Sequence, residues 1–328
     1  MKNSHLIIYL IVSFFVVGFA SSVQAGGVRP VEAGKTRWSP DGKGGAHLEN
    51  GDPQPHPAEG EVSPIGNAQT AATVLPQYGI LYHSGPVMGV GTSSPINVYY
   101  IWYGNWTGNT APAILEPLAS HIGGTPYFNI NTTYTNSAGS KIVNAVVFKG
   151  STTDSYSRGT TLTDAGVQGV VSSAITSGRL PADANGVYFV LSSKDVKESS
   201  GFCTAYCGWH TYGTIAAKTI KYAFVGDAAR CPSACTAQST LSPNGNAGAD
   251  GMASTIAHEL EEAVTDPLLN AWYSKSGAEN ADLCAWTFGT ESVASNRSHY
   301  NQTIGGLQYL IQQNWVNVSP SGHCAQSY

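Results

Sequence analysis

Apolar residues occur in short runs whose spacing alternates between that of a strand and that of a helix. Residues 96–103 are β-branched or aromatic at nearly every position, which predicts a strand. Further strands are expected at 141–148, 187–192 and 221–225, with a short one at 307–311. Helical spacing predicts helices at 112–122, 163–178 and 250–264. This order predicts an α/β (α+β) fold, a single layered domain with a central β-sheet and flanking helices.

The first 75 residues have a different character. Lys2, an apolar run at 6–20 and the small residues that end at Ala25 predict a secretory signal peptide over residues 1–25. Residues 26–75 are rich in Gly and Pro and show no apolar periodicity, which is typical of a disordered linker or a pro-segment. We therefore expect a secreted or otherwise extracellular protein, in the periplasm or cell wall in some hosts, whose folded domain covers residues 76–328. No membrane span is expected after signal removal.

The expected helix near residue 258 carries the most informative motif, HELEE at 258–262. Asp250 is a good N-cap and Pro267 forbids continuation of the helix. His258 and Glu262 are four residues apart, so they share one helical face, and Glu259 lies beside that face. An imidazole and a carboxylate so placed can hold two corners of a zinc ion, as on the helix of zincin proteases.

The motif departs from the zinc-protease pattern HExxH, in which the second histidine is a ligand and the glutamate is the general base. Here Glu262 replaces that histidine, and Glu259 is the candidate base. The alternative is an ordinary amphipathic helix with a solvated charged face. Glu261, on a different face, has no expected role in the site.

A third ligand could come from residues 276–284, which contain Glu279 and Asp282 shortly before Cys284. Catalytic zinc sites keep three protein ligands and one open position. His258, Glu262 and Glu279 meet that number, with Asp282 as a rival third ligand or as a partner of the ligands. Zinc is the expected cofactor, and calcium, which prefers oxygen ligands, is the alternative.

Six cysteines in an exported chain favour disulfide bonds. We expect a Cys284–Cys324 bridge and two local or crossed bridges among the other four cysteines, at 203, 207, 231 and 235. A zinc site made of those four is the competing interpretation. His210 follows this cluster and could either face an active cleft or be a surface or satisfied histidine. The formal net charge of −5 and the low charged fraction argue against a nucleic-acid partner.

Several motifs occur in a fixed order: YHSGP at 82–86, INVYYIWYGNW at 96–106, SKDV at 193–196, GFCTAYCGWH at 201–210, CPSAC at 231–235 and PNGNAGADGM at 243–252. In them the chain resembles the EXORDIUM / phosphate-induced protein 1 family. The plant members are secreted cell-wall proteins with growth-related roles, so that resemblance implies a secreted, cell-wall-associated protein. Because His258-Glu259 lies outside the plant pattern, the chain resembles a non-plant branch that carries a metalloprotease-like motif.

Two functions follow from these patterns. The first is a secreted zinc-dependent hydrolase, peptidase-like, that acts on a peptide. The second is a non-catalytic extracellular or cell-wall-associated protein whose carboxylates are structural or bind calcium, with a wall component as its partner.

Overall fold

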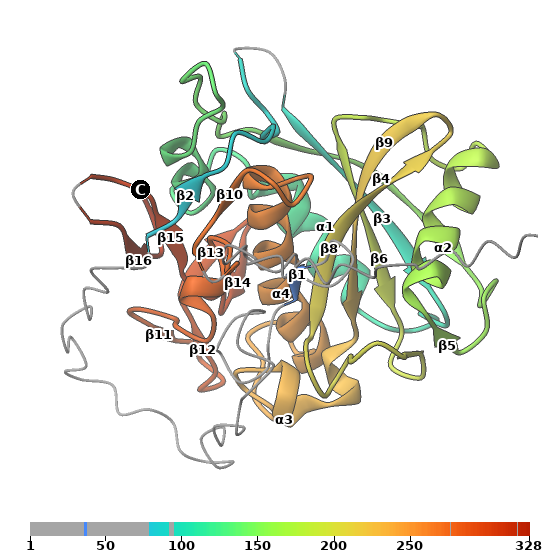
Figure 1. Cartoon of the computed structure of the whole chain (residues 1–328). Coiled ribbons are helices and arrows are strands. Elements are labelled where there is room, and N and C mark those ends of the chain that lie inside the picture. The colour runs from blue at the N-terminus through green and yellow to red at the C-terminus, as the bar shows by residue number, and fades with distance from the viewer. Residues whose placement is uncertain (1–35, 38–78, 92–94, 276, 320) are drawn as a thin grey trace, which may run out of the picture.

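A six-stranded sheet forms the centre of the protein (Figure 1). The computed structural model describes residues 36–37, 79–91, 95–275, 277–319 and 321–328, so the predicted signal peptide and most of the predicted linker lie outside the described residues. In sheet order the strands are β1 (Thr36–Arg37), β8 (Gly208–Ile215), β9 (Lys218–Gly226), β6 (Gly186–Ser192), β3 (Ile96–Tyr103) and β4 (Val146–Asp154).

The sheet is mixed. Strand β3 pairs in parallel with β4 and β6, and β6 pairs in parallel with β9. Strand β8 runs antiparallel to β9, and the two-residue β1 pairs antiparallel with β8. The expected α/β fold with a central sheet is therefore confirmed.

Helices cover both faces of this sheet (Figure 1). Helices α1 (Ala111–His121) and α4 (Ala247–Thr265) share one hydrophobic core with the face of β3 that carries Val98 and Tyr100. Helix α2 (Asp164–Thr176) packs in a second core with the opposite face, which carries Tyr99 and Ile101. Alternation of side chains along β3 thus fills two cores, which explains why nearly every residue of this strand is apolar.

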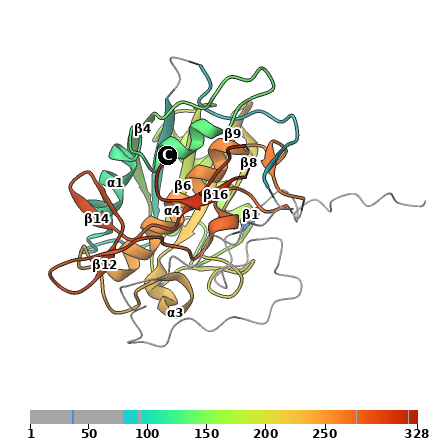
Figure 2. The same cartoon turned by 90° about the vertical axis from the view of Figure 1, so that its left-hand side faces the viewer.

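Helix α4 is enclosed on all sides, because residues 248, 249 and 251–265 are all buried. The C-terminal hairpins lie on the side of α4 away from the sheet (Figure 2). The helix begins at Ala247, where the Asn246 side chain accepts a hydrogen bond from the Ala249 amide, so the predicted N-cap at Asp250 was wrong. It ends at Thr265, two residues before Pro267, as predicted. The alternative of a solvated helix face is also wrong.

The remaining elements are short. They are β2 (Leu81–Tyr82), β5 (Thr161–Leu162), β7 (Lys197–Glu198), β10 (Trp272–Tyr273), β11 (Ser292–Val293), β12 (His299–Tyr300), β13 (Gln302–Ile304), β14 (Leu307–Tyr309), β15 (Asn314–Val316), β16 (His323–Ala325), α3 (Pro232–Cys235) and the 3-10 turns η3 (Phe128–Thr133), η4 (Ala228–Arg230) and η5 (Asp282–Cys284). Among the described helices, none is long and apolar enough to cross a membrane.

Three disulfide bonds connect the six cysteines. They are Cys203–Cys231, Cys207–Cys235 and Cys284–Cys324. The expected Cys284–Cys324 bridge is confirmed, and the other four cysteines form crossed bridges. The competing four-cysteine zinc site is wrong, because these four sulfur atoms are bonded in pairs.

The crossed pairing predicts a specific digestion product. Chymotryptic cleavage after Tyr206 should separate Cys203 from Cys207 and leave both peptides attached to the one that contains Cys231 and Cys235. Mass spectrometry of an unreduced digest checks this. A Cys231–Cys235 peptide that is attached to nothing else would show that the bridges are local and contradict the pairing.

Candidate metal centre

His258 and Glu262 project from the same face of α4, as their spacing predicts. The His258 Nε2 atom lies 3.0 Å from Glu262 Oε1. On the other side of the imidazole, the Gln312 amide contacts Nδ1. The contact is made by the amide nitrogen Nε2 of Gln312, a hydrogen-bond donor, and it fixes the imidazole ring with the ring's Nε2 atom directed at the carboxylates.

Asp282, in η5, completes a group around this imidazole. Its Oδ1 atom lies 3.6 Å from His258 Nε2, and its backbone amide donates to Glu262 Oε1 at 3.2 Å. His258, Glu262 and Asp282 each offer one ligand atom within 4.8 Å of the other two. Of the two rivals for a third ligand position beside His258, Asp282 is the one in this group.

Glu279 belongs instead to a group around His210. The His210 Nε2 atom lies 3.3 Å from Glu279 Oε2 and 3.8 Å from Glu262 Oε2. Alternation along β8 sends Trp209 into the core beside α2 and His210 to the α4 side. The sequence alone allowed two roles for His210: a residue that faces an active cleft, or a surface or satisfied histidine. Its position next to a buried tryptophan becomes informative only once residues 208–215 are known to be a strand.

Glu259 lies against β8, beside the same cluster. It is fully buried, and neither of its carboxylate oxygens has a hydrogen-bond partner among the residues that the structure describes. A Cβ atom on Gly208 would come within 3.0 Å of Glu259 Oε1 and 2.6 Å of the Thr255 Cγ2 atom. A glycine is therefore required here for the helix and its carboxylate to approach the strand so closely.

The cluster carries an excess of acidic groups. Burial raises the pKa of Glu262 to about 7, reinforced by the Asp282 carboxylate and opposed by His258. Burial also raises the pKa of Glu259 and of Glu279 well above the usual range. No lysine or arginine of the described residues contributes to these shifts. A bound cation would supply the missing positive charge.

The pKa values of the two histidines shift in opposite directions. Burial alone would lower the pKa of His258, but the Glu262 carboxylate, with Asp282 and Glu259, outweighs burial and raises it. Burial and the charge of His258 lower the pKa of His210 to about 3. His210 is therefore neutral, which is the state in which an imidazole binds a metal.

Glu261 occupies a separate buried site. Its Oε2 atom accepts a hydrogen bond from Asn314 Nδ2 at 2.6 Å, and the side chain is fully buried. Glu261 is on a different face from His258, as expected, but it is part of the core.

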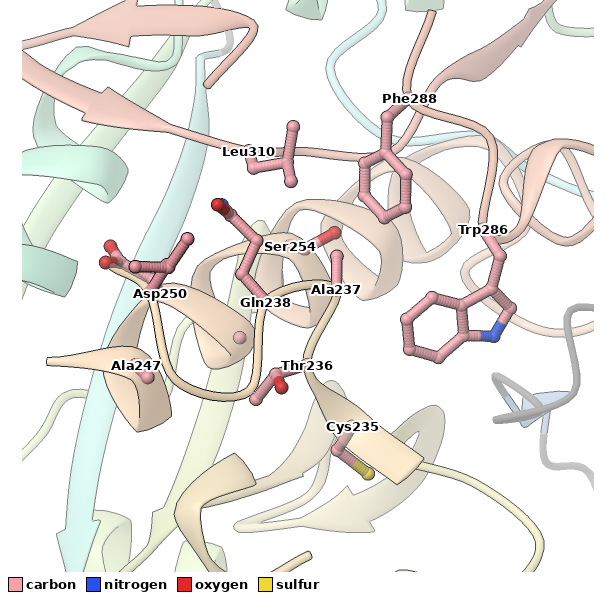
Figure 3. Close-up of a pocket in the computed structure, with 12 residues that line it drawn as sticks. Cys235, Thr236, Ala237, Gln238, Ala247, Asp250, Ser254, Trp286, Phe288 and Leu310 are labelled. Atoms are coloured by element: carbon pink, nitrogen blue, oxygen red, sulfur yellow. The ribbon is translucent and has the colours of Figure 1, made fainter. Parts of the chain in front are cut away.

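A pocket borders α4 one turn before His258 (Figure 3). It is lined by residues that include Gln238, Ser254, Trp286, Phe288 and Leu310. No residue of the His210 and His258 groups lines it, so the pocket and the cluster are neighbours along α4 but separate.

Comparison with known proteins was made over the whole chain. Residues 80–316 match the family model described as the phosphate-induced protein 1 conserved region. The chain is 34% identical over 273 residues to Protein EXORDIUM-like 5 of Arabidopsis thaliana, covering 71% of this chain and 74% of that protein. It is 34% identical over 275 residues to Protein EXORDIUM-like 3 of the same plant, covering 72% and 80%. Protein EXORDIUM is 25% identical over 236 residues, covering 62% and 70%.

No solved structure matches the chain. The matched region includes α4, β8 and the loop that carries Glu279 and Asp282, so the candidate metal centre lies within it. These matches confirm the resemblance found in the sequence motifs, and the chain belongs to the phosphate-induced protein 1 (EXORDIUM-like) family.

Proposed function

We propose that this protein is a secreted metal-dependent hydrolase, peptidase-like in chemistry, whose cation is held by His258, Glu262 and Asp282. The observation that carries the proposal is the convergence of these three ligand atoms in the core, without a lysine or arginine of the described residues to balance them. One imidazole and two carboxylates are a ligand set that zinc accepts. A catalytic zinc site of this kind keeps its fourth position for water.

Glu259 is the proposed general base. A cation held by His258, Glu262 and Asp282 would supply Lewis-acid chemistry, and Glu259 would accept a proton from the water molecule whose oxygen bonds to the substrate carbonyl carbon. The carbon–nitrogen bond then breaks, and the proton passes from Glu259 to the departing amine. The two unpartnered, buried oxygens of Glu259 support this role, because nothing among the described residues uses them.

Burial favours a second candidate, a non-catalytic extracellular or wall protein with a structural cation, calcium being the alternative ion. The cluster residues are at most 3% exposed, as expected of a site that only holds an ion. Carboxylate-rich sites suit calcium, although calcium sites rarely use imidazole.

Strand β8 offers a route by which substrate could reach the cluster. It is the last long strand of the sheet, and the register pairs His210 with Thr36 of the two-residue β1. Strand β1 belongs to the segment expected to be a linker or pro-segment. Its removal would free the backbone of β8 beside His210, where an extended peptide could add as a strand.

This route predicts that processing activates the protein. Limited proteolysis that removes residues 26–75 should increase hydrolysis of a quenched peptide library severalfold, while a zinc chelator abolishes it. The Glu259→Gln variant, treated in the same way, is the matched control for a contaminating protease. Equal, chelator-insensitive signals from both would favour the non-catalytic candidate.

Substitutions at the centre should separate ligand from base. His258→Ala should lower zinc content and melting temperature together, because a ligand is lost. Glu259→Gln keeps the ligands and should retain zinc while the hydrolysis rate falls by about 10² or more. Elemental analysis, melting curves and peptide assays measure the three effects.

Glu261→Ala is the control for the effect of changing a buried residue of α4 that is not a proposed ligand. It should reduce the free energy of unfolding by about 1–3 kcal/mol, because Asn314 Nδ2 loses its partner, and leave zinc content unchanged. If zinc content changes alike in all three variants, the HELEE segment has no specific role in binding.

The acidic cluster also predicts a pH dependence of the metal-free protein. The pKa of Glu262 is 4.5 when exposed and about 7 when folded, so between these values the unfolded state releases a proton that the folded state keeps. Stability therefore falls as pH rises through this interval. Glu259, Glu279 and His258, with raised pKa values, act in the same direction, whereas His210 acts in the opposite one.

Melting temperatures of chelator-treated protein from pH 4.5 to 7.5 check this sign. They should decrease with pH, and added zinc should restore stability most at the high end, where the ligands are ionised. Glu262→Gln should flatten the decrease. A melting temperature that rises steadily across the interval in the chelated protein is incompatible with this cluster.

A further inference from the structure

The cluster contains two ligand groups rather than one. His258, Glu262 and Asp282 form the first, and His210, Glu262 and Glu279 form the second. Glu262 is their only shared member. Its two oxygens face different histidines, since Oε1 lies 3.0 Å from His258 Nε2 and Oε2 lies 3.8 Å from His210 Nε2. A carboxylate turned in this way can bind one cation through each oxygen.

The distances inside both groups suit metal coordination. Two ligand atoms that each lie about 2.1 Å from a tetrahedral cation are about 3.4 Å apart. In the first group the imidazole nitrogen lies 3.0 and 3.6 Å from its carboxylate oxygens. In the second group the corresponding distances are 3.3 and 3.8 Å. The second group is therefore as well formed as the first.

Unused ligand atoms point to an occupant of the second group. Within the described part of the chain, Glu262 Oε2 and Glu279 Oε1 have no hydrogen-bond partner, although the Glu262 side chain is fully buried and Glu279 is only 1% exposed. Buried carboxylate oxygens are almost always hydrogen-bonded or bound to a cation. The Glu262 oxygen that remains without a partner is the one on the His210 side.

The formal charge of the buried carboxylates also favours two cations. Glu259, Glu262, Glu279 and Asp282 together carry a formal charge of −4 when all are ionised. One divalent cation leaves −2, whereas two divalent cations bring the sum to zero. An uncompensated double charge in the core is expensive, so the second cation is favoured.

We propose that the centre holds two divalent cations joined by Glu262, one bound by His258 and Asp282 and the other by His210 and Glu279. The inference rests on the proposed metal centre and adds a second cation to it. Paired cations about 3.5–4 Å apart could position the attacking water and polarise the substrate carbonyl of the proposed hydrolysis. Nitrogen and oxygen donors in this mixture suit zinc, cobalt or manganese.

Metal titration of the purified full chain tests the proposal. The protein is stripped with a chelator, dialysed and titrated with Co²⁺ alone, and the bound ion is counted by elemental analysis and by visible absorption. We expect about two cobalt ions per chain. At full occupancy, magnetic coupling through the Glu262 carboxylate should weaken the cobalt paramagnetic resonance signal per ion.

Variants assign the two ions. His210→Ala and Glu279→Gln should each bind about one cobalt ion, and the remaining ion should show an uncoupled signal. His299→Ala is the control, because it removes a buried histidine that contacts Glu291 and belongs to neither ligand group. This variant should still bind about two cobalt ions. Because the wild-type count needs no substitution, poor folding of a variant does not remove the test.

The outcomes are distinct. One ion in the wild type, lost in His258→Ala and kept in His210→Ala, overturns the second cation but leaves the proposed function standing. Two ions that persist in His210→Ala also overturn it, since the second ion would then be bound elsewhere. No bound ion overturns both proposals.

Discussion

The burial of ionisable side chains on α4 is the constraint around which this protein is organised. An enclosed helix would ordinarily be apolar on all sides, yet α4 carries a histidine and three glutamates into the core. Transfer of isolated charges from water to such an environment is strongly unfavourable. Several neighbouring segments therefore supply polar groups: His210 from β8, Asp282 from η5, and Gln312 and Asn314 from the C-terminal segment.

The same constraint explains why so many short elements surround one helix. The C-terminal hairpins contribute little regular structure, but they cover the side of α4 that the sheet leaves open. The segment before Cys284 contacts α4, because Asn280 Nδ2 donates to the Glu261 carbonyl and the Asp282 amide donates to Glu262, and Cys284 is bonded to Cys324 in β16. Partners for the buried polar groups thus come from segments far apart in the sequence.

Local sequence patterns were sufficient to predict part of this arrangement. The helical face shared by His258 and Glu262 follows from their spacing, and the helix end follows from Pro267. Strands β3, β6 and β9 were found because each contains an apolar run, whereas β4 covers Val146–Asp154, overlaps the predicted strand 141–148 only over its first three residues, and is polar from Lys149 onward. Strand β8 was not predicted, because its glycines and threonines hide the alternation that sends His210 toward the helix.

Other features depend on tertiary context that no local pattern contains. Glu261 looks like a solvated residue in the sequence, and its burial is explained by hydrogen bonds from Asn314, 53 residues away, and from Asn131. The roles of Glu279 and Asp282 could not be separated, because their distribution between two histidines depends on where β8 lies.

The crossed disulfides give the chain a dependence on its surroundings. Cys207 directly precedes β8, and Cys235 lies in α3, shortly before α4, so their bond ties together the two elements that contribute His210 and His258. In a reducing compartment this bond would be absent, and only the pairing of β8 with β9 and its packing on α4 would hold the strand in place. Oxidation would then add a covalent link between the two elements that the metal centre proposed above depends on.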